Sequence, residues 1–216
     1  MNINKRSLLL GMLLGDGCLK TKTHIQKNGT ESKYYEYVIA HCAKQKDYLE
    51  YKRDLFHSIM GGKSPNIIYE KRTNSYRWSR CHKLFRLFHK TLYSNNNKKY
   101  FTDKVFRYLT PHSIAIWYMD DGGLSNRVSS AEMRLYTYFS EEEADKAMKY
   151  FNDIWGIKVK KRKYTNTDQF NLIFNTTEGR KFEELISKYI IPSMKYKLPS
   201  YNITRALDTQ KSDDIV

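Results

Sequence analysis

The segments LLGMLLGDG (residues 9–17) and IAIWYMDDG (residues 114–122) are two apolar nonamers that both end in Asp-Gly. Each predicts a buried helix. Thr110 is placed to cap the second helix, and Pro111 suits its first position, where the missing N–H costs nothing. The glycines that follow the aspartates are expected to adopt the left-handed conformation that commonly ends a helix; they are Gly17 and the pair Gly122-Gly123. An internal repeat of this kind indicates two halves built to one plan.

The segments after each nonamer also match in order. In the first half we predict strands at 19–26 and 34–39 around an Asn28-Gly29 turn, a helix at 44–60, strands at 67–71 and 76–80, and a helix over 84–92. In the second half we predict a turn and a strand at 134–139, a helix at 141–155 opened by a capping box, strands at 157–163 and 170–174, and a helix over 182–189. The sequence therefore predicts an α+β fold of order αββαββα, twice. The predicted halves are residues 1–104 and 105–216.

The chain is strongly basic and yet rich in core-forming residues. It has 38 Lys and Arg against 23 Asp and Glu, a formal net charge of +15 that is spread along the whole sequence. Hydrophobic residues make up 40% and aromatic residues 14%, which excludes a disordered basic tail. A folded protein with this excess of positive charge is expected to bind a polyanion.

The apolar runs and the cysteines bear on the cellular compartment. The longest apolar run, residues 8–14, is far shorter than the ~18–20 residues of a membrane-spanning helix, so we expect no membrane partner. This run imitates a signal peptide, but Asp16 follows it where small neutral residues are expected, so we do not expect secretion. The cysteines are odd in number and form no CxxC pair, which favours a reducing interior; they are Cys18, Cys42 and Cys81. Zinc held by His41-Cys42 and Cys81-His82 stays an alternative to simple packing roles. We expect an intracellular protein, in the cytoplasm of a bacterium or phage-infected cell or in an organelle matrix.

Several predicted strands alternate polar, mostly basic side chains with smaller or apolar ones. In residues 19–26 and 157–163, one strand face carries Lys, Arg, His and Gln. A sheet face with these donors suits base edges in the major groove and DNA phosphates, whereas the alternative is a solvated face without a partner. The residues predicted to contact nucleic acid are Lys20, Lys22, His24, Gln26, Lys71, Arg77, Arg134, Lys158, Lys160, Arg162, Gln169 and Asn171.

Each nonamer ends its helix on aspartate, which is unfavourable by itself. A helix C-terminus carries a partial negative charge, so a terminal Asp costs roughly 0.3–1 kcal/mol. If the two helices pack side by side, Asp16 and Asp121 leave the same end of the pair, and a hard divalent cation would relieve their repulsion. The alternative is that each Asp-Gly is only a turn sequence, but the repetition at corresponding positions favours a metal site. The string YMDD at residues 118–121 also occurs in reverse transcriptases, at the tip of a β-hairpin rather than at the end of a capped helix.

Together, the two nonamers, the doubled element order and the lysines that close each half resemble a single-chain LAGLIDADG homing endonuclease. The specific parts are WYMDDGG at residues 117–123 and IPSMKYKLP at residues 191–199, while the first nonamer is looser, with Leu14 where the family name has aspartate. The resemblance spans residues 5 to about 203. It implies a monomer of two pseudo-symmetric halves, whose antiparallel, saddle-shaped sheets lie over a long double-stranded DNA target.

The resemblance also implies the site residues and the reaction. The implied catalytic residues are Asp16, Asp121, Lys99 and Lys197, and the implied metal ligands are Asp16, Asp121, Gly15 and Asp120. Lys98 stays an alternative to Lys99, and the Asp120 side chain is a second choice to Asp121. The implied activity is Mg²⁺-dependent hydrolysis of both DNA strands, a double-strand break with short 3′ overhangs, with Mn²⁺ expected to support cleavage too. The alternatives on the same fold are an intron RNA maturase and a nucleic-acid-binding protein that does not cut.

Overall fold

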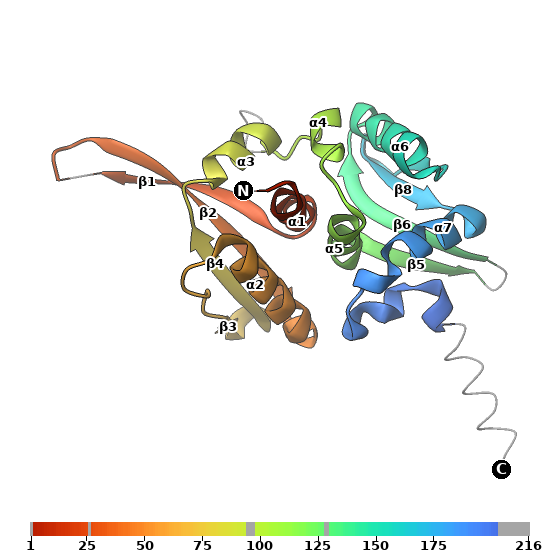
Figure 1. Cartoon of the computed structure of the whole chain (residues 1–216), viewed down its shortest axis with the longest axis horizontal. Coiled ribbons are helices and arrows are strands. Elements are labelled where there is room, and N and C mark those ends of the chain that lie inside the picture. Colours follow the sequence, from red (N-terminus) through yellow and green to blue (C-terminus); the bar gives the residue numbers. More distant parts are fainter. Residues whose placement is uncertain (1, 26, 94–97, 128–129, 203–216) are drawn as a thin grey trace, which may run out of the picture. The chain divides into compact units, whose positions relative to one another are not determined.

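The computed structural model describes residues 2–25, 27–93, 98–127 and 130–202. The chain forms two compact units, Met1–Phe101 and Thr102–Val216 (Figure 1). The boundary predicted from the sequence, between residues 104 and 105, lies inside the short helix α4 (Asp103–Phe106). Within the described part of the chain, no helix is both long and apolar enough to cross a membrane.

The first unit is a four-stranded antiparallel sheet against which helices α2 (Lys46–Met60) and α3 (Phe85–Leu92) pack. Its elements are α1 (Ile3–Leu14), β1 (Cys18–Ile25), β2 (Glu31–Cys42), α2, β3 (Ile68–Glu70), β4 (Ser75–Cys81) and α3, with 3₁₀ turns at Ala43–Gln45 and Lys71–Thr73. The strand order is β1-β2-β4-β3. Aromatic rings fill the space between α2 and the sheet: the ring of Tyr37 lies 5.3 Å from that of Phe56 and 5.1 Å from that of Trp78.

The second unit repeats this arrangement. After α4 come α5 (Pro111–Asp121), β5 (Gly122–Arg127), β6 (Ser130–Phe139), α6 (Glu141–Trp155), β7 (Lys160–Lys163), β8 (Phe170–Phe174) and α7 (Thr176–Ile186), then 3₁₀ turns at Ser187–Tyr189 and Pro192–Lys197. The strand order β5-β6-β8-β7 matches that of the first sheet. Phe174 and Phe182 stack in its core with ring centres 4.1 Å apart. The predicted α+β fold, αββαββα in each half, is confirmed.

Local sequence signals explain the helix starts. Thr110 Oγ1 accepts a hydrogen bond from the Ser113 amide, and the Ser113 hydroxyl in turn accepts one from the Thr110 amide. Ser140 and Glu143 form the predicted capping box at the start of α6. Several strand predictions differ from the structure. β2 and β6 begin earlier than predicted, at Glu31 and Ser130 rather than at residues 34 and 134. β5 was not predicted because its sequence, GGLSNR, contains few strand-forming residues, and the strand predicted at 157–163 begins only at Lys160.

The predicted role of the glycines after the nonamers is wrong. Gly122 has φ −80°, and neither Gly17 nor Gly123 is among the residues with positive φ. These glycines are needed for space instead. A Cβ atom on Gly17 would overlap the hydroxyl of Tyr37 and the carbonyl oxygen of Met12, and one on Gly122 would overlap the ring and carbonyl of Tyr118.

Substitution of Gly17 by alanine is therefore expected to be strongly destabilising. We expect Gly17→Ala to lower the free energy of unfolding by about 2–3 kcal/mol, because a backbone carbonyl cannot move away cheaply. Gly29→Ala is the matched control, since it has φ +80° but open space around it, and should cost about 1 kcal/mol. Urea unfolding of both variants measures the difference, and equal losses would contradict the steric explanation.

Candidate active site and nucleic-acid interface

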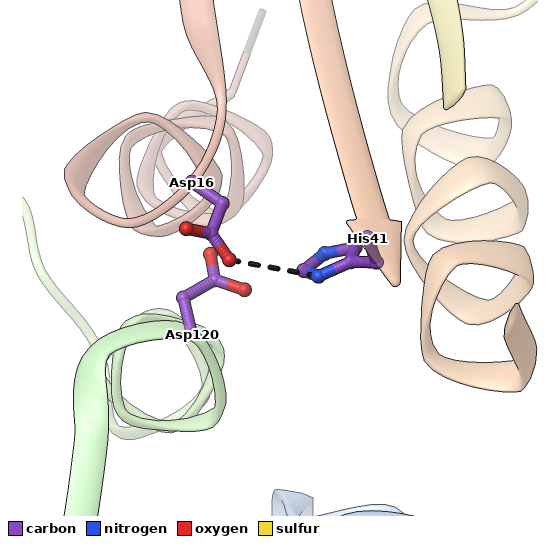
Figure 2. Close-up of side chains that lie close together, drawn as sticks. All are labelled: Asp16, His41 and Asp120. Carbon is purple, nitrogen blue, oxygen red and sulfur yellow. Dashed lines mark ion pairs between the residues drawn. The ribbon is translucent and has the colours of Figure 1, made fainter. Parts of the chain in front are cut away.

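In the first unit, Asp16 lies just beyond α1 and faces a histidine on β2. The Oδ2 atom of Asp16 lies 3.5 Å from Nδ1 of His41 (Figure 2). The His41 side chain is only 4% exposed, whereas that of Asp16 is 46% exposed. Strand alternation places His41 on the buried face of β2, where its ring lies 5.0 Å from that of Tyr48. A buried imidazole thus lies beside one oxygen of an accessible carboxylate.

The lysine segment that closes the first half reaches the end of α1. Lys99 Nζ donates a hydrogen bond to the carbonyl oxygen of Gly15, at 2.7 Å. Gly15 is the C-cap residue of α1, and carbonyls at a helix C-terminus lack partners within the helix. Lys98, the alternative left open by the sequence, is exposed. The geometry therefore favours Lys99 as the lysine associated with Asp16.

In the second unit, Asp121 is the last residue of α5. Trp117, one turn earlier and 1% exposed, donates a hydrogen bond from Nε1 to Oδ2 of Asp121, at 3.1 Å. This contact fixes the rotamer of the carboxylate from the helix itself. Asp120, the third residue drawn in Figure 2, also lies in the last turn of α5.

Lys197 occupies in the second unit the place that Lys99 has in the first. Its side chain is buried, and Nζ donates hydrogen bonds to the carbonyl oxygens of Met119 at 2.6 Å and Asp120 at 3.0 Å. The Tyr118 hydroxyl donates to the carbonyl oxygen of Lys197 at 2.7 Å. Burial raises the pKa of Tyr118, so this hydroxyl stays protonated as a donor. In both units, a lysine from the end of the half therefore binds the carbonyl of the residue just before the final aspartate of the motif.

The first sheet presents a basic face with one acidic residue inside it. Lys20 pairs across the ladder with Glu36 and Lys22 pairs with Tyr34, so all four side chains share one face. Lys22 Nζ lies 2.6 Å from Glu36 Oε2, and the Ser79 hydroxyl donates to Glu36 Oε1 at 2.7 Å. Burial alone would raise the pKa of Glu36, but these hydrogen bonds from Lys22 and Ser79 outweigh it and lower that pKa. His24 and Arg77 are also exposed.

The second sheet repeats this pattern. Glu132 Oε2 accepts a hydrogen bond from Arg134 at 2.9 Å, and its Oε1 lies 3.6 Å from the guanidinium of Arg162. Glu132 and Glu36 occupy equivalent positions in the two sheets. Cys18 and Gly123 are each the second residue after the motif aspartate, and their strand partners are Val38 and Arg134. Each glutamate lies two residues before that partner. Lys160 is exposed on the same face as Arg134. Each basic face therefore contains a glutamate that holds basic side chains.

The structure places the remaining predicted contact residues less uniformly. Asn171 is 6% exposed, so it does not present its side chain to a partner; it lies on the inner strand β8, where it pairs with Arg162 of β7. Lys71 is exposed in a 3₁₀ turn and Lys158 is exposed before β7 begins, while Gln169 is half-buried. Gln26 lies outside the described residues.

His41 was not predicted from the sequence as a partner of Asp16, but only as a candidate zinc ligand beside Cys42. Neighbours on a strand point to opposite faces, and here His41 is buried while Cys42 is exposed, so the two do not form a shared site. The burial of His41 could have been predicted from the alternation of apolar residues along β2, which places His41 on the core face with Tyr37 and Ile39.

Comparisons with known proteins agree with this architecture. A family model described as "LAGLIDADG DNA endonuclease family" matches residues 6–182. A protein named "Protein RecA" from Mycolicibacterium flavescens is 31% identical over 201 residues, covering 88% of this chain and 45% of that protein. The chain thus spans less than half the length of this relative. "DNA endonuclease I-ChuI" from Chlamydomonas applanata is 26% identical over 215 residues and is covered over 95% of its length, against 92% of this chain.

Among solved structures, "The homing endonuclease I-WcaI bound to its DNA recognition sequence" superposes with a TM-score of 0.68. It is 23% identical, and the match covers 91% of this chain and 86% of that one. This similarity shows that the fold is shared.

Proposed function

Because this chain belongs to the LAGLIDADG DNA endonuclease family, we propose that it is a site-specific endonuclease that binds a long double-stranded DNA target and cuts both strands, with one active centre in each half. The observation that carries this proposal is the arrangement found in both units. A motif helix leads to an aspartate, and a lysine distant in sequence binds the carbonyl just before it: Lys99 on Gly15, and Lys197 on Asp120.

The donor set fits a hard divalent cation. In the first half, the carboxylate of Asp16 and the carbonyl oxygen of Gly15 are the candidate ligands; in the second half they are the carboxylate of Asp121 and the carbonyl oxygen of Asp120. Oxygen-only donors, few per half, suit Mg²⁺, which usually completes its shell with waters and substrate phosphate oxygens. When bound there, Mg²⁺ would supply Lewis-acid polarisation of the phosphate and a more acidic water. We expect Mn²⁺ to support the same reaction.

The chain's own residues supply positioning and charge. His41 and Trp117 hold one oxygen of Asp16 and of Asp121, so the carboxylates meet the substrate in a fixed orientation. Lys99 and Lys197 place a positive charge at the carbonyl just before each aspartate, and we assign to them the stabilisation of the negative charge that the scissile phosphate gains in the transition state. Because both ammonium groups are already held by helix carbonyls, little reorganisation is needed during the reaction.

The exposed faces of the two sheets are the proposed DNA interface. The chain carries a net charge of +15, and basic side chains of this kind neutralise phosphates and donate to guanine and adenine edges. Asn171 is excluded from this interface by its burial. The residues that we assign to it are Lys20, Lys22, His24 and Arg77 from the first unit, and Arg134, Lys160 and Arg162 from the second, with Lys71, Lys158 and Gln169 beside them.

Removal of the Glu36 charge is expected to strengthen DNA binding. Glu36→Gln would release Lys22 and remove a negative charge from the face that meets phosphates. We expect the affinity for an arbitrary duplex at low salt to rise about 3- to 10-fold, with the gain shrinking as salt increases. Glu50→Gln is the matched control, since Glu50 is ion-paired with Lys46 on α2 and should change affinity less than about twofold. Equal effects of the two variants would contradict the proposed interface.

The experiment that tests the function uses a randomised-duplex library, incubated with the protein in Mg²⁺ and in Ca²⁺, with sequencing of the bound and the cut molecules. Binding of one long motif in both ions and cutting of it in Mg²⁺ would support the proposal. Specific binding without cutting in either ion would indicate a non-cleaving DNA-binding protein and overturn it. Absence of specific DNA binding would also overturn it, and would direct the search to structured intron RNA.

A further inference from the structure

Three tyrosines in the second unit form a cluster beside its motif aspartate. They are Tyr136 and Tyr138 on β6, and Tyr164 just after β7. The rings of Tyr138 and Tyr164 stack with centres 4.9 Å apart and planes 7° apart. Tyr136 lies against Gly123, where an added Cβ atom would come within 2.9 Å of Cε2 of Tyr136. Since Gly123 is two residues after Asp121, the cluster adjoins the end of α5.

The backbone is strained to create this cluster. Tyr138 has φ 50°, a left-handed conformation that is rare for a bulky residue. Between the pairs Leu135–Leu172 and Phe139–Phe170, β6 is longer than β8, which marks a bulge. The hydroxyl of Thr137 donates to the carbonyl oxygen of Phe170 at 2.9 Å inside this bulge. The Tyr138 ring is turned outward by it and remains 58% exposed. Strain retained at one exposed aromatic residue points to a function rather than to packing.

The hydroxyl of Tyr164 is the second unusual feature. It is buried and, within the described residues, makes no hydrogen bond. Burial raises the pKa of Tyr164, so its hydroxyl stays protonated as a donor. A buried hydroxyl that makes no hydrogen bond lowers the stability of the fold, unless a bound ligand accepts its hydrogen bond.

We propose that this tyrosine cluster is a DNA contact belonging to the second active centre alone. On DNA binding, the exposed ring of Tyr138 turns from the Tyr164 ring onto the adjoining nucleotide, and the hydroxyl of Tyr164, buried in the free protein, becomes able to donate a hydrogen bond to the phosphate of the strand cut beside Asp121. The inference rests on the proposed endonuclease function.

Among the described residues of the first unit, no such tyrosine cluster occupies the equivalent place. Ala40 on β2 occupies the position equivalent to that of Tyr136 on β6. Each lies two residues after an equivalent residue, since Val38 pairs with Cys18 and Arg134 pairs with Gly123. The two halves therefore contact their strands differently: a buried histidine supports Asp16, and a tyrosine hydroxyl serves the centre of Asp121. The consequence is that loss of the Tyr164 hydroxyl should affect the cutting of one strand only.

The test is Tyr164→Phe, which removes the hydroxyl and keeps the stacked ring. The substrate is a supercoiled plasmid carrying the duplex recovered from the randomised library, with each strand followed separately. We expect the cutting rate of one strand to fall at least about tenfold, the other to change less than about twofold, and nicked circles to accumulate. The melting temperature and the affinity for the duplex in Ca²⁺ should stay close to those of the wild type.

Tyr69→Phe is the matched control. Tyr69 also packs against a second tyrosine, Tyr76, with ring centres 4.9 Å apart, but its hydroxyl already donates to Asn74. This variant should cut both strands at the wild-type rate. If Tyr164→Phe slows both strands equally, or neither, the proposal is overturned. If the wild type itself does not cut, the endonuclease function fails instead, so the two failures are distinguishable.

A second variant tests the ring of Tyr138 by binding rather than by cleavage. Tyr138→Asn removes the ring and places there a residue that tolerates positive φ. We expect stability to be unchanged or higher and the Kd for the same duplex in Ca²⁺ to rise about tenfold, since aromatic contacts to nucleotides contribute strongly to affinity. An unchanged Kd would overturn the proposed contact of Tyr138.

Discussion

Asp121→Asn is expected to abolish double-strand cleavage while leaving DNA binding in Ca²⁺ nearly intact. The amide has the shape of the carboxylate, and its oxygen can still accept the hydrogen bond from Trp117 Nε1. The variant loses the charge that would hold Mg²⁺ at the end of α5, and residues that act as a unit at a metal centre contribute several orders of magnitude to rate. We expect a loss of roughly 1,000-fold or more in the cleavage rate, measured on the duplex recovered from the library.

Two further substitutions make this result specific. Asp153→Asn removes one charge from the exposed surface of α6 and should leave cleavage unchanged. Asp120→Asn distinguishes the neighbouring aspartates, because the backbone carbonyl of Asp120, which binds Lys197, is retained in this variant. If Asp121→Asn still makes double-strand breaks and Asp120→Asn does not, our assignment of the ligand is wrong.

Lys197→Met is expected to impair both stability and cleavage. Lys197 is buried, and its ammonium group binds two carbonyls in the last turn of α5. Methionine fills similar space but leaves these carbonyls without their charged donor, which should lower the free energy of unfolding by about 2–3 kcal/mol. Loss of the positive charge beside Asp121 should also reduce the cleavage rate by about 100-fold.

Lys195→Met is the matched control for this variant. Lys195 lies in the same 3₁₀ segment but is exposed, so its replacement should change stability by less than about 0.5 kcal/mol and leave the cleavage rate unchanged. Urea unfolding gives the stability, and cleavage is measured at a temperature where both variants are folded. A Lys197→Met protein that is less stable but cuts at the wild-type rate would limit Lys197 to a structural role.

Features that depend on neighbouring residues were predictable from the sequence. The start of α5 follows from Thr110 and Pro111, and the start of α6 from the capping box of Ser140 and Glu143. The two nonamers predicted equivalent helices, and hence the repeat. By contrast, β5 has little intrinsic strand preference and forms by pairing with β6, which a local pattern does not show.

Features that depend on distant contacts were not predictable in the same way. Alternation gives the face of a strand but not what covers it, so Asn171 was expected to be exposed and is buried by its place on a central strand. The glycines after the nonamers are required by the close approach of Tyr37 and Tyr118, not by a left-handed turn. The preference for Lys99 over Lys98 appears only when the end of the first half is seen against Gly15.

The most direct test of two active centres in one chain is a cleavage time course on the supercoiled plasmid, with both strands mapped at nucleotide resolution. We expect conversion to linear DNA only with Mg²⁺ or Mn²⁺, one fixed cut in each strand, and short 3′ overhangs. A product nicked in a single strand however long the reaction, or binding of the site with no cutting in either metal, would contradict it.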